Sequence, residues 1–123
     1  MSKLRKVTLH AARSKTFPEG SIRHGYEFVA PLTAEGRIDA EAWKAHRGEC
    51  FARRFWGDDE ARGLLVHRPG GRGGANWAFE LGETLDEEGE GFRFADHTFV
   101  EGEYVSAPDP EGELTTFKVV SVS

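Results

Sequence analysis

The sequence predicts an all-β, mainly antiparallel domain: a small β-barrel or β-sandwich of about seven or eight strands with one short helix. Short segments with apolar residues at every second position recur along the chain, and Gly and Pro separate them. The 123 residues include 15 Gly, 9 Phe and 3 Trp, a composition that favours strands. This length fits a single domain, residues 1–123, with a core of its own.

The segment 50–81 predicts a three-stranded antiparallel meander with turns at 57–60 and 68–74. In its first strand Arg53 and Arg54 point to opposite faces. Its middle strand, residues 63–68, carries an apolar run at 64–66 that is typical of a strand covered on both faces. The third strand places large apolar side chains on one face: Trp77, Phe79 and Leu81.

Strands are also predicted on both sides of the meander. The pattern at 5–13 places Val7, Leu9 and Ala11 on one face. A second strand follows at 24–32, where Pro31 marks its end or an edge position. A hairpin is predicted from 98–106 and 114–122, and its last strand needs two covered faces or a bulge, because its apolar residues change face.

One short helix is predicted at about 39–47. Asp39 is a suitable N-cap, Glu41 complements the helix dipole, and Gly48 is expected to close the helix as the C-cap. A helix of this length is unstable alone. We therefore expect Trp43 to pack against the sheet.

The net charge of −5 hides an uneven distribution. Residues 1–79 contain fourteen Lys or Arg and nine Asp or Glu, whereas residues 80–113 contain one Arg and twelve Asp or Glu. Exposed acidic loops explain such a distribution without a specific partner. The single cysteine, Cys50, gives no sign of an oxidising compartment. With no long apolar run, the chain is expected to be soluble and cytoplasmic, with no membrane partner.

A phosphate-binding or single-stranded nucleic-acid surface is the first site hypothesis. The Arg- and Gly-rich loop 68–74 offers backbone N–H groups and two guanidinium groups. Nearby arginines and aromatic rings could hold a backbone and stack bases. The candidate residues are Arg53, Arg54, Trp56, Arg68, Arg72 and Trp77. The acidic total argues against nucleic acid as the main partner, and the loop lacks the Walker pattern.

A metal-dependent enzyme is the second alternative, with weaker support. Asp86, Glu88, Glu90 and Gly91 imitate half of a calcium loop but lack its final Glu. His97, Glu101 and Glu103 share a face of one expected strand, yet residues 97 and 101 would lie about 13 Å apart. We therefore assign no metal, no cofactor and no catalytic residue.

Nucleophilic catalysis has little support in the sequence. Cys50 could be activated by His46 or His67, but a lone cysteine at the start of an apolar strand is usually a small core residue.

The remaining hypothesis is a non-enzymatic binding module that contacts a protein partner or a second copy of itself. A small barrel could hold an apolar ligand inside, but the expected inward residues are large enough to fill it. These residues are Trp77, Phe79, Leu81, Tyr104 and Phe117. We therefore expect a packed interior and an interaction through the surface.

Overall fold

The computed structural model describes residues 3–67, 76–81, 93–94, 97–111 and 113–123. Within them the chain forms, in order, β1 (Lys3–Ala11), β2 (Ser21–Leu32), α1 (Ala40–Ala45), a 3₁₀ turn (Arg47–Glu49), β3 (Phe51–Trp56), β4 (Asp59–His67), β5 (Trp77–Leu81), β6 (Arg93–Phe94), β7 (Tyr104–Pro108) and β8 (Leu114–Val122).

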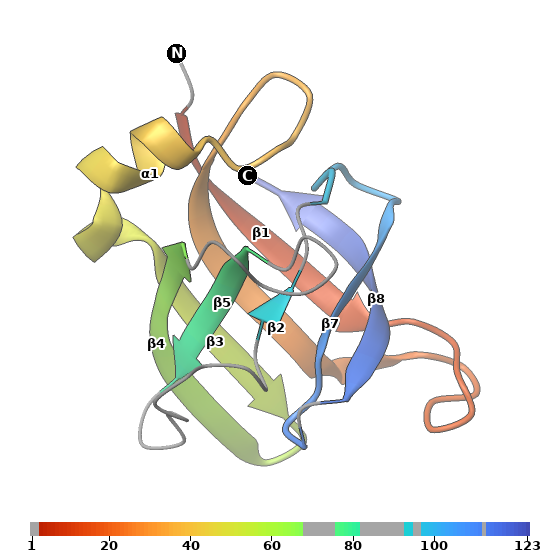
Figure 1. The fold of residues 1–123 in the computed structure, drawn as a ribbon. Coiled ribbons are helices and arrows are strands. Elements are labelled where there is room, and N and C mark those ends of the chain that lie inside the picture. Colours follow the sequence, from red (N-terminus) through yellow and green to blue (C-terminus); the bar gives the residue numbers. More distant parts are fainter. Residues whose placement is uncertain (1–2, 68–75, 82–92, 95–96, 112) are drawn as a thin grey trace.

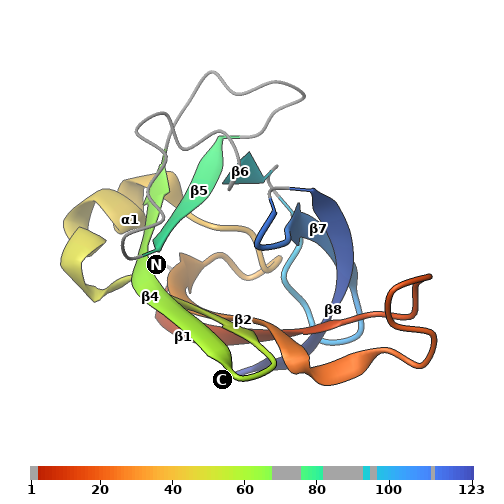
Figure 2. The ribbon, with the colours of Figure 1, turned by 90° about the horizontal axis from the view of Figure 1, so that it is seen from below.

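The described strands form one antiparallel sheet in the order β6-β5-β4-β3-β2-β1-β8-β7 (Figure 1). The sheet is curled into a half-barrel, and seen from below its two edges bend toward each other (Figure 2). The all-β class, the meander of β3, β4 and β5 and the β7–β8 hairpin are therefore confirmed. Of the two architectures considered, a single curled sheet agrees with the barrel and not with the sandwich.

The concave face of the sheet is filled by aromatic side chains. The ring of Tyr26 stacks on Phe79 with centroids 4.6 Å apart and meets the edge of Phe117 at 5.5 Å. Phe28 contacts Phe79 and Phe99 at 5.4 and 5.2 Å. All five side chains are fully buried. The expected inward positions of β1 and β5 are buried as well: Val7, Leu9, Ala11, Trp77, Phe79 and Leu81.

Two glycines allow neighbouring strands to approach closely. A Cβ atom at Gly63 in β4 would lie 1.6 Å from the carbonyl oxygen of Glu80. A Cβ atom at Gly25 in β2 would lie 1.9 Å from the carbonyl oxygen of Leu9. No other residue type fits such contacts, because every other side chain begins with a Cβ. These positions help the sheet to curl.

The helix α1 lies beside β4 and β5 at one end of the sheet (Figures 1 and 2). As predicted, Asp39 is the N-cap, and its side chain accepts hydrogen bonds from the N–H groups of Glu41 and Ala42. Trp43 is buried, and its Nε1 donates to the carbonyl oxygen of Leu65 at 3.0 Å. The packing of Trp43 against the sheet is therefore confirmed.

The predicted end of the helix is wrong. The helix stops at Ala45, and His46 is the C-cap. The chain then tightens into the 3₁₀ turn Arg47–Glu49, in which Cys50 N–H donates to the carbonyl oxygen of Arg47. Gly48 therefore lies inside this turn with a negative φ angle and does not act as a left-handed cap.

Several strand boundaries and faces also differ from the prediction. The strand expected from residue 98 begins only at Tyr104, because Phe99 N–H donates to Gly36 outside the sheet and Gly102 turns the chain at a φ of 92°. The apolar run of β4 is not covered on both faces. Leu65 is buried, whereas Leu64 on the opposite face is 36% exposed, because it points out of the half-barrel.

The bulge proposed for the last strand is present and explains its pattern. Leu9 pairs with Val119, and Val7 pairs with Val122, so one extra residue lies on β8 between the two pairs. Val119 is buried, and Val122 packs against the core, while Val120 between them is exposed. The C-terminal residue continues this pairing through two hydrogen bonds of 2.9 Å between Ser123 and Lys6.

None of the helices in the described residues is long and apolar enough to cross a membrane.

Candidate functional site

The structure separates the residues predicted to form a phosphate or nucleic-acid surface. Arg53 lies on the convex face of β3 and Arg54 on its concave face, where Arg54 is buried. Trp77 is also buried, and Trp56 packs against the core beside Phe117. These two rings are therefore part of the interior packing. Arg68, Arg72 and the whole loop 68–74 lie outside the described residues, so the loop hypothesis stays a prediction.

Arg53 belongs to a row of alternating charges across the convex face of β1 to β4. Glu27 lies 3.8 Å from Lys6 and 3.6 Å from Arg53, and Arg53 also contacts Glu60 at 3.0 Å. Arg62 pairs with the other oxygen of Glu60. Hydrogen bonds from Arg62 and Arg53 lower the pKa of the Glu60 carboxyl. Since carboxylates partner these cations, the row does not present a basic patch for phosphate.

Arg54 is buried inside the half-barrel, where it helps to connect neighbouring strands. Its side chain hydrogen-bonds the hydroxyl of Tyr26, which in turn donates to the carbonyl oxygen of Pro108. This joins β3 to β2 and to the end of β7. Burial raises the pKa of Tyr26 to about 12, although the nearby guanidinium opposes the rise. The phenol is therefore protonated at neutral pH and acts as a donor between strands.

The residues considered for a metal site on the strand after residue 97 do not converge. The ring Nε2 of His97 lies 3.2 Å from the carbonyl oxygen of Ser106 in β7, the last strand of the described sheet. The carboxylate of Glu101 accepts from the N–H of Val122. Each group therefore completes backbone hydrogen bonding at a separate place. The calcium-like segment 86–91 lies outside the described residues.

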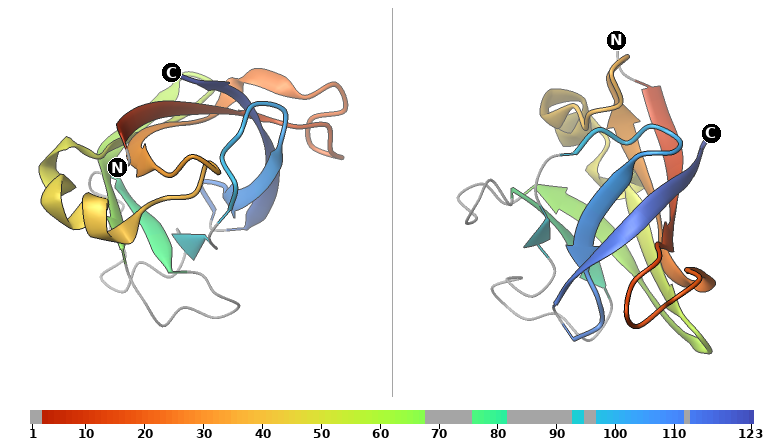
Figure 3. Two further views of the ribbon diagram at one scale, coloured as in Figure 1. Left: turned by 90° about the horizontal axis from the view of Figure 1, so that it is seen from above. Right: turned by 90° about the vertical axis from the view of Figure 1, so that its right-hand side faces the viewer.

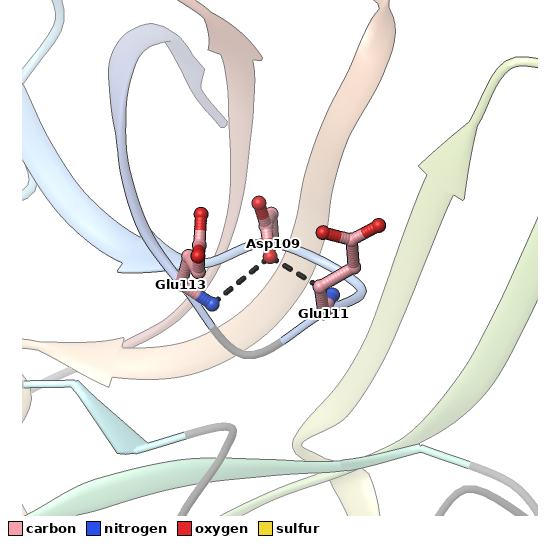
Figure 4. Close-up of side chains that lie close together, drawn as sticks. All are labelled: Asp109, Glu111 and Glu113. Carbon is pink, nitrogen blue, oxygen red and sulfur yellow. Dashed lines mark hydrogen bonds between the residues drawn. The ribbon is translucent and has the colours of Figure 1, made fainter.

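Within the described residues, one set of three potential metal ligands comes close together. The carboxylate oxygens of Asp109, Glu111 and Glu113 lie within 4.8 Å of one another in the β7–β8 turn (Figure 4). Asp109 Oδ1 accepts from the N–H groups of Glu111 and Glu113 at 2.8 and 3.0 Å (Figure 4). These bonds shape the turn, which gives Asp109 a structural role. The other two carboxylates are exposed and give the tip of the hairpin a negative charge.

Cys50 is a core residue with an unreactive thiol. The side chain is fully buried, and this burial raises the pKa of the thiol to about 11. The two histidines considered as activating bases have other partners. The ring of His46 contacts Glu49 at 2.6 Å, and the ring of His67 lies against Trp77 with centroids 4.5 Å apart.

The described surface also contains a groove that sequence reasoning did not predict. It has a volume of about 500 Å³, lies between the β1–β2 hairpin and the convex face of β7 and β8, and is called the outer groove below. Its lining includes His10, Arg13, Ile22, Tyr104, Lys118 and Val120. Figure 3 shows the β1–β2 hairpin extending away from the sheet beside these strands.

Two strongly exposed apolar side chains, Ile22 and Tyr104, line the outer groove. Ile22 is 77% exposed and Tyr104 62% exposed, and Leu114 further along β8 is 69% exposed. A register shift next to the groove causes the exposure of Ile22. His10 pairs with Gly25 and Ala11 with Ser21, so residues 22–24 have no partner on β1.

The placement of Tyr104 inside the barrel was wrong. The inward residues of β7 are Val105 and Ala107, which are buried, and Tyr104 and Ser106 alternate with them on the convex face. The sequence contains a signal for this placement, because Tyr104, Ser106, Thr116 and Lys118 alternate with smaller or more apolar neighbours.

Comparisons with protein-family models, with curated proteins and with solved structures gave no match.

Proposed function

We propose that this protein is a non-enzymatic interaction module that binds a protein through the convex face of its sheet. The observation that carries the proposal is the outer groove with its exposed apolar neighbours. Ile22 and Tyr104, which both line the groove, are each more than three-fifths exposed. Grouped apolar side chains in water are favourable contact surface for another protein, because burying them removes their unfavourable hydration.

The filled interior supports a surface interaction over a ligand held inside the half-barrel. The rings of Tyr26, Phe28, Phe79, Phe99 and Phe117 contact one another across the concave face. The polar groups next to them, Arg54 and the Tyr26 hydroxyl, join strands to each other. This arrangement favours a rigid scaffold that presents its outer surface.

A second groove on the convex face is the competing surface. It has a volume of about 240 Å³ and is lined by Val29 and Phe51 between the charged residues Lys6, Glu27 and Arg53. Phe51 is 60% exposed. This groove is smaller, and its charges already pair within the chain. We therefore assign the interaction to the outer groove and use Phe51 as the matched control.

Cross-linking with mass spectrometry tests this assignment. The tagged full-length chain is cross-linked in cell lysate, and the peptides joined to it are mapped for the wild type, for Tyr104→Ser with Ile22→Ser, and for Phe51→Ser. We expect cross-links at Lys118 and in the segment around Arg13 that the double variant loses and Phe51→Ser keeps. Cross-links that stay the same in the double variant, or that depend on Phe51, would contradict the proposal.

A further inference from the structure

We infer that the partner at the outer groove is an acidic peptide segment of another protein, in which a carboxylate lies close to an apolar side chain. This inference rests on the function proposed above and names the chemistry of the partner. It is carried by the register of three neighbouring strands, by the cations in the groove, and by the apolar side chains beside these cations.

The register of β1, β8 and β7 places three residues next to one another on the convex face. His10 of β1 pairs with Lys118 of β8, and Lys118 pairs with Tyr104 of β7. Residues paired across neighbouring strands point to the same face, with Cβ atoms about 5 Å apart. All three line the outer groove, so Lys118 stands between two residues with rings. Arg13, just after the end of β1, adds a second cation to the lining.

The two cations of the outer groove lack the carboxylate partners that other cations of the convex face have. In the row of alternating charges on β1 to β4, the Lys and Arg side chains each contact a Glu. Within the described residues, neither Arg13 nor Lys118 forms an ion pair. Glu19 is the one carboxylate among the lining residues. The groove therefore keeps a positive charge, although the chain carries −5, and an acidic partner supplies the counter-charge.

The moderate charge of the groove favours a peptide carboxylate over a nucleic-acid strand. Burial lowers the pKa of the His10 ring from its ordinary value, so this ring is uncharged at neutral pH. The remaining charges of the lining are two cations and one carboxylate. A nucleic-acid strand needs a longer series of cations, because the protein must neutralise several phosphates. One or two carboxylates match this groove better.

Apolar side chains beside the cations set the second requirement for the partner. Ile22, Tyr104 and Val120 line the same groove and are 77%, 62% and 38% exposed. An apolar side chain of the peptide that packs against them removes this surface from water. The ring of Tyr104 is the expected centre of that contact, while the carboxylate fixes the orientation and disfavours basic peptides. A run of acidic residues without an apolar neighbour should therefore bind weakly.

Selection from a library of random peptides displayed on phage tests the inference on the full chain. We expect the wild type to enrich peptides that combine Asp or Glu with an aliphatic or aromatic residue. Fluorescence polarisation then measures their dissociation constants, which Lys118→Glu should raise by about tenfold or more. Lys118→Arg keeps the charge and should keep the affinity. Lys44→Glu on α1 changes the net charge equally at an exposed site and should change the affinity by less than about twofold.

The outcomes separate this inference from the proposed function. A selection that enriches no peptide, or peptides without an excess of acidic residues, overturns the inference. Acidic peptides whose affinity is the same for Lys118→Glu and Lys44→Glu overturn it as well. A labelled single-stranded oligonucleotide that binds more tightly than every selected peptide, and loses this binding in Lys118→Glu, would assign the groove to nucleic acid.

The cross-linking experiment decides separately whether a protein contacts Tyr104 and Ile22, so the proposed function can stand when the acidic partner fails. Circular dichroism of each variant must show the wild-type spectrum. Arg13→Glu provides a second charge reversal at a position outside the strands, and it should weaken the same peptides.

Discussion

At the scale of single residues, Gly63 illustrates how the backbone of this sheet limits its sequence. Its Cα lies so close to β5 that a Cβ would be 1.6 Å from the carbonyl oxygen of Glu80. This distance is far shorter than a nonbonded contact, so any side chain at this position would force the strands to move. Gly48 is the natural comparison, because a Cβ at this position has no neighbour within 4 Å.

We expect Gly63→Ala to lower the free energy of unfolding by about 3 kcal/mol or more, because β4 and β5 must move apart. Gly48→Ala should change it by less than about 0.5 kcal/mol. Urea denaturation followed by tryptophan fluorescence measures both values. Equal stabilities of the two variants would show that β4 and β5 do not approach each other as described.

The buried phenol of Tyr26 predicts a loss of stability in alkali. Its pKa is raised from 10.0 to about 12 in the folded protein. The folded state therefore holds this proton more tightly than the unfolded state does. The stabilisation is fully present below about pH 10 and is lost as the pH rises from about 10 to 12, in total about 2 to 3 kcal/mol.

Unfolding by urea at several pH values between 9 and 12 measures this effect. Tyr26→Phe is less stable at neutral pH, because it lacks the hydrogen bond to Pro108, but its stability should fall less steeply in alkali. Lysines titrate in the same range in both proteins, so the comparison isolates Tyr26. Parallel pH profiles for the wild type and Tyr26→Phe would contradict the assigned pKa.

At the scale of elements, the successful predictions concern features that depend on residues close together in the sequence. Alternating apolar residues located β1, β2 and β5, an apolar run between turn-forming residues located β4, and the change of face in the last strand indicated its bulge. The N-cap at Asp39 was also predicted, because capping depends on a few neighbouring residues. These features need no knowledge of distant contacts.

Predictions failed where distant contacts decide the structure. The helix was expected to end at Gly48, but the return of the chain to β3 tightens it into a 3₁₀ turn. Phe99 was expected in a strand, but its backbone bonds to Gly36 in another part of the chain. The outer groove was missed for the same reason, since it forms where the β1–β2 hairpin meets β7 and β8.

The cap of α1 gives a test at the scale of elements. Asp39→Ala removes the acceptor for two backbone N–H groups and should lower the free energy of unfolding by about 1 kcal/mol. Lys44→Ala is the control in the same helix, because its only described ion pair is an exposed contact with Glu41 at 3.7 Å. Thermal unfolding of both variants measures the difference, and equal melting temperatures would rule out a capping role for Asp39.

At the scale of the whole molecule, the concave face stabilises the fold and the convex face is available for contacts. The interior aromatic rings and the Arg54–Tyr26–Pro108 connection hold the curled sheet together. The outer groove and the exposed apolar side chains Ile22 and Tyr104 lie outside. The sequence-based hypothesis of an interaction module therefore gains a specific surface, while the alternative at the loop 68–74 stays a prediction.

Native mass spectrometry of the full chain, purified gently from cells without chelator, tests the central claim most directly. The account predicts a species that carries the additional mass of a bound protein chain, and its abundance should fall in Tyr104→Ser but not in Phe51→Ser. A monomer that retains a metal ion, a nucleotide or an oligonucleotide would contradict the account. Such a result would move the functional site to the acidic turn or to the Arg- and Gly-rich loop.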